Sequence, residues 1–145
     1  MHEFQLINNF FVNLSKHNKS ALGLNDDVFF DKKKGIVISV DTYNIKSHFL
    51  DFKSPDLIIK KIIRSSISDL ICKGVKPKYY FISGSGNKND FTNKNLLKIS
   101  KSLKKEQQKY DISLCGGDTT FSNKLSFTIV SLGYSKRIVY RNKAR

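Results

Sequence analysis

The segment GIVISVDTYN, residues 35–44, is the feature that most restricts the fold of this chain. Its almost unbroken run of Ile and Val is typical of a β-strand that is buried on both faces. Asp41 interrupts that run. Because a charged group is costly to bury unless something compensates it, we expect a compensating partner beside Asp41.

The other segments predict helices over 3–17, 54–74 and 94–110, from apolar side chains at helical spacing. Further strands are expected within 22–30, 78–86, 111–117 and 125–135. This order favours an α+β fold with a mixed β-sheet and helices on one face, in a single domain over 1–145. GSG at 84–86 is expected to be a plain loop, since it lacks the third glycine of a dinucleotide-binding turn.

Charge and composition narrow the classes of partner. The 26 Lys and Arg outnumber the 12 Asp and Glu, which suits phosphorylated small molecules, nucleic acid or anionic lipid. The lysines are spread along the chain without the arginine clusters and interleaved aromatics of nucleic-acid binders, so we expect no nucleic-acid partner. No membrane-spanning stretch is present, and the two cysteines show no zinc spacing, which predicts a cytoplasmic protein without a membrane partner.

The familiar catalytic motifs do not occur. The sequence has no P-loop, no calcium-binding loop, no HExxH and no Ser–His–Asp or Cys–His arrangement. We therefore expect no catalytic nucleophile or general base from the protein. What remains is a set of aspartates at the ends of elements: Asp26, Asp27, Asp41, Asp69 and Asp118.

Oxygen ligands of this kind suit Mg²⁺, which usually completes its octahedron with water and substrate phosphates. The alternative interpretation is that each aspartate caps a helix or forms a turn. For a single aspartate that alternative is the stronger one, and only the joint pattern favours a metal site.

Four segments carry the joint pattern: GLNDD, SVDT followed by HF, SISDLICKGVKP and LCGGDTT. In order and spacing they resemble the thiamine-monophosphate kinase family, which reads roughly GIGDD, STDT…HF, NLSDLAAMGAxP and LVGGDTT. The resemblance extends over nearly the whole chain. The family belongs to the wider superfamily of aminoimidazole ribonucleotide synthetase and selenophosphate synthetase, whose members share the GGDTT segment.

The resemblance implies transfer of the γ-phosphoryl group of ATP to thiamine monophosphate, with several Mg²⁺ ions, on homodimers whose sheets join into a barrel. It implies that the GGD segment is a turn that brings backbone to the nucleotide phosphates. Positions that match metal ligands are Asp27, Ser39, Val40, Asp41, Asp69 and Asp118. Gly117, Asp118 and Arg141 match ATP contacts, and His48 matches the contact to thiamine monophosphate.

The chain departs from the family pattern at Asn25, Val40, Lys46 and Ser66. The family also has a second domain of similar size, which we expect to be absent from this chain. Two alternatives stay open. One is a related ATP-dependent enzyme, such as selenophosphate synthetase or a hydrogenase-maturation protein, and the other is a non-catalytic nucleotide-binding fragment.

Overall fold

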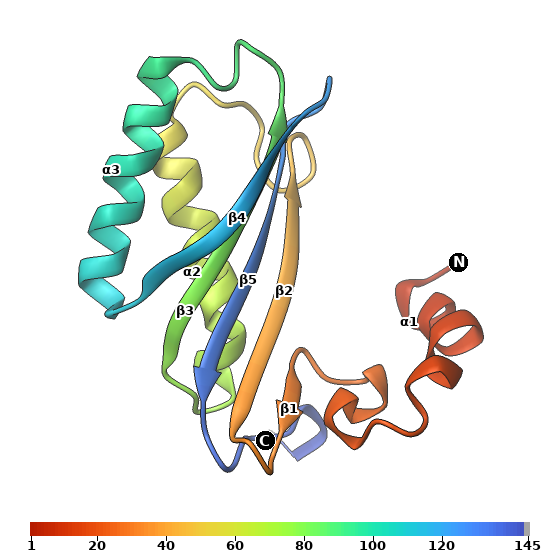
Figure 1. Ribbon diagram of the computed structural model, residues 1–145. Helices are drawn as coiled ribbons and strands as arrows, with labels where there is room; N and C mark the ends of the chain where they lie inside the picture. The colour runs from red at the N-terminus through yellow and green to blue at the C-terminus, as the bar shows by residue number, and fades with distance from the viewer. Residues whose placement is uncertain (144–145) are drawn as a thin grey trace.

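Two long helices lie side by side against one face of a five-stranded sheet (Figure 1). The computed structural model describes residues 1–143. The helices are α2 (Pro55–Cys72) and α3 (Asn93–Tyr110). The strands are β1 (Phe29–Asp31), β2 (Ile36–Asn44), β3 (Pro77–Gly86), β4 (Ser113–Phe121) and β5 (Ser126–Tyr134).

The sheet has the order β1-β2-β5-β3-β4, in which only β3 and β4 run parallel. The expected α+β fold with a mixed sheet and helices on one face is therefore confirmed. Local signals explain the limits of α2, which has Pro55 at its start and Gly74 just after its end with φ +74°. Thr92 caps α3 by accepting a hydrogen bond from the Asn95 amide.

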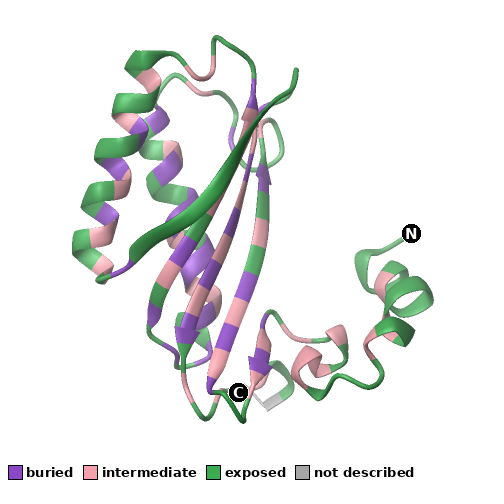
Figure 2. Cartoon of the chain, in the orientation of Figure 1, coloured by how far each residue is buried: buried purple, intermediate pink, exposed green. Residues whose placement is uncertain are grey.

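The core lies between the helices and the inner face of the sheet (Figure 2). In β2 the buried and exposed residues alternate, with Val37, Ser39 and Tyr43 inside and Val40 64% exposed on the outer face. The prediction that β2 is buried on both faces is therefore wrong for the single chain. No layer of the described residues covers the outer face, which exposes apolar side chains such as Val40, Phe81 and Tyr134.

Both glycine-rich segments turn out to be parts of strands. GSG at 84–86 forms the end of β3 instead of the expected loop, and GGDTT lies within β4 instead of forming a turn. The reason is close packing: a Cβ on Gly117 would collide with the carbonyl oxygen of Ile82 on β3, and one on Gly84 would touch two phenylalanine rings. Glycine is favoured in a strand where another group approaches this closely.

The N-terminal segment is helical but irregular. A single turn of α-helix, α1 (Glu3–Leu6), continues into a π-helical turn (Ile7–Phe11) and a 3₁₀ turn (Val12–Ser15). The continuous helix predicted over 3–17 is therefore only partly confirmed. Its apolar stripe has little to pack against, since Phe10 and Leu14 stay exposed. Within residues 1–143, no helix is long and apolar enough to cross a membrane.

Candidate functional site

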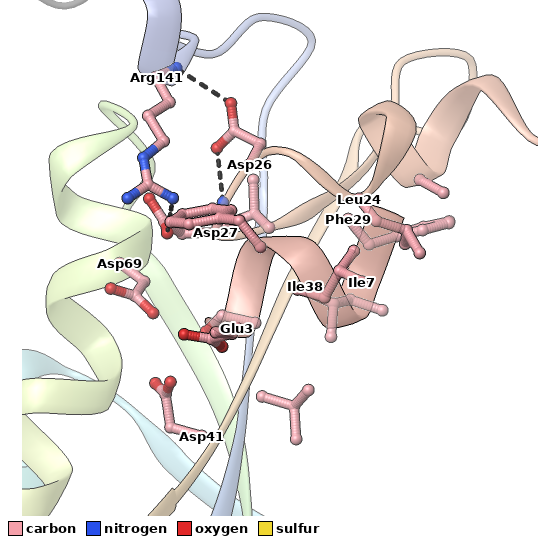
Figure 3. A pocket seen from close by; sticks show the side chains of 15 residues that line it. Glu3, Ile7, Leu24, Asp26, Asp27, Phe29, Ile38, Asp41, Asp69 and Arg141 are labelled. Carbon is pink, nitrogen blue, oxygen red and sulfur yellow. Dashed lines mark hydrogen bonds and ion pairs between the residues drawn. The ribbon is translucent and has the colours of Figure 1, made fainter. Parts of the chain in front are cut away.

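A pocket of about 560 Å³ opens between β2, α2 and the N-terminal segment (Figure 3). It collects most of the acidic residues that the sequence singled out. The polar side chains that line it are Glu3, Asp26, Asp27, Ser39, Asp41, Asp69 and Arg141, and Val40 lies among them. Asp27, Ser39, Val40, Asp41 and Asp69, five of the six expected metal ligands, therefore share one pocket.

Two elements position the centre of this pocket. Ser39 and Asp41 are two residues apart on β2, so both side chains lie on the face that α2 covers. Asp69 projects from the facing side of α2, and Figure 3 shows its carboxyl group opposite that of Asp41. Residues that are distant in sequence meet here because α2 packs against β2.

The carboxyl groups of Asp41 and Asp69 face each other closely enough that each affects the pKa of the other. Burial, together with the negative charges of Asp41 and Asp27, raises the pKa of Asp69 to about 7. Burial also raises the pKa of Asp41. A divalent cation between the two groups would remove the repulsion between their negative charges.

Ser39 supplies an independent observation. Its side chain is 2% exposed, and its hydroxyl is the one buried side-chain polar atom in the described part of the chain that has no hydrogen-bond partner. Leaving a buried hydroxyl unpaired is unfavourable by about 1–3 kcal/mol, so such a group calls for an explanation. The hydroxyl lines the same pocket as Asp41, where a hydrated cation would satisfy it.

A second group of charges holds the wall of the pocket around Asp26 and Asp27. The Lys73 ammonium lies 2.5 Å from Asp26 Oδ1 and 3.6 Å from Asp27 Oδ2. Arg141 donates its backbone N–H to Asp26 and a guanidinium N–H to Asp27 Oδ1 at 3.3 Å. Burial raises the pKa of Asp26, but hydrogen bonds from Arg141, Lys73 and the Asp27 amide outweigh burial and hold that pKa below 3.8.

Sequence reasoning missed Lys73 altogether, because a lysine before a helix-ending glycine resembles any surface lysine. It also gave no separate role to Asp26. The structure assigns the two neighbouring carboxylates different surroundings: the Asp26 side chain is 6% exposed, and that of Asp27 is 42% exposed.

His48 lies outside this pocket, in a loop that follows β2. It lines a separate hollow of about 400 Å³ together with Lys46, Phe49 and Lys61. Its Nδ1 accepts a hydrogen bond from the Asn44 amide at 2.9 Å, and its ring meets Tyr43 edge to face. The imidazole is therefore fixed in orientation.

Asp118 and Gly117 are not brought to the acidic pocket. Asp118 pairs in register with Ser83, Ser83 with Thr128, and Thr128 with Thr42. Three strand spacings of about 4.8 Å therefore separate β4 from β2. Asp118 also shares the outer face of the sheet with Thr42, whereas Asp41 lies on the inner face.

The donor set fits Mg²⁺, which prefers oxygen ligands and keeps several waters. Among residues 1–143, no three His, Cys, Asp or Glu side chains are close enough to form a ready-made cage for one ion. Mg²⁺ sites that receive nucleotide phosphates need only one or two carboxylates, so this open arrangement suits an ion that arrives with its substrate.

Comparisons with known proteins agree with the fold. The family model for "AIR synthase related protein, N-terminal domain" matches residues 23–134. The thiamine-monophosphate kinase of Buchnera aphidicola subsp. Schizaphis graminum is 34% identical, over 99% of this chain and 45% of that protein. The thiamine-monophosphate kinase of Haemophilus influenzae is 30% identical, over 100% of this chain and 45% of that protein.

Solved structures give the same result. The complex described as "AaThiL complexed with AMPPCP and TMP" has a TM-score of 0.83 at 26% identity, over 99% of this chain and 45% of that chain. Thiamine monophosphate kinase from Aquifex aeolicus has a TM-score of 0.80 at 24% identity, over 100% of this chain and 48% of that chain. The present chain thus spans a little less than half the length of these relatives.

Proposed function

The chain belongs to the AIR synthase related proteins through their N-terminal domain, and we propose that it forms the Mg-ATP-binding part of a thiamine-monophosphate kinase. The observation that carries the proposal is the pocket in which Asp27, Ser39, Asp41 and Asp69 meet. The relatives named thiamine-monophosphate kinase, and the solved complex with AMPPCP and TMP, support the choice of nucleotide and acceptor.

The reaction passes the γ-phosphoryl group of ATP to a phosphate oxygen of thiamine monophosphate. A phosphate group is already largely ionised at pH 7, since its second pKa is about 6, so the acceptor needs no general base. The main obstacle is repulsion between two anionic phosphates. Bound Mg²⁺ would supply charge neutralisation and alignment for in-line transfer.

The residues of this chain would contribute binding and orientation. Asp27, Asp41 and Asp69 would hold Mg²⁺ through their carboxylates, and Ser39 through its hydroxyl. Val40, on the same strand, would add its backbone carbonyl as a further oxygen ligand. In the metal-free pocket, a proton on Asp69, whose pKa is raised to about 7, reduces the repulsion between Asp41 and Asp69.

Other expected contacts belong to the nucleotide and the acceptor. We assign Gly117, Asp118 and Arg141 to ATP and Asp118 also to metal, and His48 to thiamine monophosphate. Arg141 already lies at the rim of the acidic pocket, where it could turn from Asp27 to a phosphate. Asp118 is three strands away on the outer face, so its role needs a substrate or partner that reaches over the sheet edge.

We further propose that two chains pair through the outer faces of their sheets and close a barrel in the homodimer. The support is the exposed apolar surface there, which includes Val40 at 64%, Phe81 at 38% and Tyr134 at 54% exposure. A soluble protein rarely leaves one apolar face of a sheet in water. The protein would then work as a cytoplasmic dimer.

Calorimetry with ATP in the presence of Mg²⁺ tests the proposed function at the level of this chain. We expect weak binding that requires Mg²⁺ and is lost in Asp41→Asn and Asp118→Asn, while both variants keep the far-UV circular dichroism of the unmodified chain. Asp56→Asn, at the exposed first turn of α2, is the matched control. Unchanged Mg-ATP affinity in both test variants would contradict the proposal.

The role of His48 is tested separately, on protein that contains this chain together with the remaining half of the length of its relatives. We expect His48→Ala to raise KM for thiamine monophosphate more than KM for ATP, because His48 lies in a hollow separate from the acidic pocket. His17→Ala, in the irregular N-terminal segment, serves as the control. Equal effects of His48→Ala on both substrates would remove His48 from the acceptor site.

A further inference from the structure

Lys73 is an unusual lysine in this chain. Among the lysines within residues 1–142 it alone is buried, with 5% of its surface exposed. It caps the C-terminal end of α2, and its ammonium contacts the carboxylates of both Asp26 and Asp27. A buried ammonium needs such partners, because an unpaired charge inside a protein is strongly unfavourable.

Lys73 also joins three separate segments. Its ammonium contacts Asp26, whose carboxylate accepts hydrogen bonds from the amides of Asp27 at 2.8 Å and Arg141 at 3.0 Å. Its carbonyl oxygen accepts a hydrogen bond from the Val139 amide at 3.0 Å. The turn at 26–27, the end of α2 and the C-terminal segment therefore meet at this one residue.

The position of Lys73 on α2 relates this junction to the acidic pocket. Asp69 precedes Lys73 by four residues, which is about one helical turn, so the helix fixes the spacing between them. Any group held by Lys73 is therefore held at a defined place relative to Asp69. Asp27 is such a group, and its negative charge acts on the Asp69 carboxyl.

We propose that Lys73 is a positioning residue of the metal site: its ammonium anchors Asp26 to the end of α2, which aims the Asp27 carboxylate at Asp69. The inference rests on the proposed function, in which Asp27 and Asp69 hold Mg²⁺. It divides the two adjacent carboxylates into an anchor, Asp26, and a ligand, Asp27.

Simple electrostatics and positioning predict opposite effects of removing Lys73 on the affinity for the metal. A cation near Asp27 repels Mg²⁺, so its loss should strengthen metal binding if charge alone mattered. Positioning predicts weaker binding, because the freed turn would have to be ordered again by the metal. The direction of the change therefore decides between the two.

The experiment titrates the 145-residue chain with Mn²⁺ and follows free Mn²⁺ by electron paramagnetic resonance. We expect Lys73→Met to weaken Mn²⁺ binding about tenfold, the size typical of losing an outer-shell support of a metal ligand. Lys73→Arg keeps the charge and the donors and should retain most of the affinity. If Lys73→Met does not fold, Asp26→Asn breaks the same ion pair with an isosteric side chain and should weaken binding in the same direction.

Arg64→Met is the matched control, because it also removes a cation of α2 that pairs with a buried carboxylate. Arg64 bonds Glu106, whose side chain is 5% exposed, on the far side of α2 from the pocket. It should lose comparable stability and keep its Mn²⁺ affinity. Amide hydrogen exchange adds a readout that needs no metal: Lys73→Met should lose protection at Asp27 and Arg141, and Arg64→Met should not.

Unchanged or stronger Mn²⁺ binding in Lys73→Met, or equal losses in Lys73→Met and Arg64→Met, would overturn the inference. If the unmodified chain binds no Mn²⁺, the metal site of the proposed function is contradicted. The exchange rates of the Asp27 and Arg141 amides then decide the role of Lys73 by themselves.

Discussion

The carboxyl group of Asp69 on α2 faces that of Asp41 on β2 across the acidic pocket. Burial and the negative charge of Asp41 raise the pKa of Asp69 to about 7, so Asp69 holds a proton below that pH. The pair is therefore a site where a proton and a divalent cation compete, and this competition gives a prediction about pH.

Without metal, we expect the chain to lose stability as the pH rises from 5 to 8. Asp69 has a pKa of about 7 in the folded chain, above its ordinary value of 3.8, so the folded state binds a proton that the unfolded state has already released. The stabilising effect is present at low pH and is lost as the pH passes 7. Because Asp69 is only partly buried, screening limits the change to on the order of 1 kcal/mol.

Urea unfolding in EDTA at pH 5 and pH 8 measures this difference. Asp69→Asn should remove most of the pH dependence, and Asp56→Asn on the same helix should not. Millimolar Mg²⁺ should stabilise the unmodified chain more at pH 8 than at pH 5. A chain that gains stability between pH 5 and pH 8 in EDTA would refute the raised pKa of Asp69.

Because the hydroxyl of Ser39 is unpaired, we expect its removal to raise the stability of the metal-free chain and to weaken metal binding. Ser39→Ala removes a buried polar atom that has no partner, so the metal-free chain should become more stable by about 1 kcal/mol. The same change should weaken Mn²⁺ binding, because it removes one oxygen from the pocket. Urea unfolding in EDTA and Mn²⁺ titration together test both effects.

Ser131 provides the control, since it faces Ser39 across β2 and β5 and is equally buried. Its hydroxyl is hydrogen bonded to Ser66 at 2.9 Å. Ser131→Ala should therefore destabilise the chain by about 1 kcal/mol, because it leaves Ser66 unpaired. If both alanine variants change the free energy of unfolding in the same direction, the assignment of Ser39 as an unsatisfied ligand is wrong.

Several elements could be predicted because their signals are local. Ser54 and Pro55 before an apolar helical face, and Gly74 after it, gave the limits of α2 to within two residues. The glycine-rich strands could not be predicted in this way. Gly117 is needed because the Ile82 carbonyl of a distant strand approaches it, and no local pattern reports that contact.

The candidate site also has a part that the sequence predicts and a part that only the folded structure shows. Asp41 stood out in the sequence because it interrupts an apolar strand, and the family pattern grouped it with Asp27 and Asp69. The ion pair between Lys73 and Asp26 joins two segments far apart in the chain, so only the folded structure reveals it. Asp118 matched the same family pattern, yet the strand order places it three strands from Asp41.

The proposed homodimer gives a prediction about mass and surface charge. Light scattering at micromolar concentration should give twice the 16.6 kDa of one chain. Val40→Lys should shift the population to single chains, because it places a charge in the apolar outer face. Leu57→Lys, at a similarly exposed position on α2, is the control and should leave the dimer intact. A mass of one chain for the unmodified protein would contradict this assembly.

Formation of thiamine diphosphate is the measurement that tests the account most directly. Protein that contains these residues together with the remaining half of the family's length should convert ATP and thiamine monophosphate to ADP and thiamine diphosphate. Chromatography should show equal amounts of the two products, only when Mg²⁺ is present, and none with Asp41→Asn. Residues 1–145 alone should bind Mg-ATP and form little or no product. ATP hydrolysis without thiamine diphosphate, or phosphoryl transfer that persists in Asp41→Asn, would contradict the account.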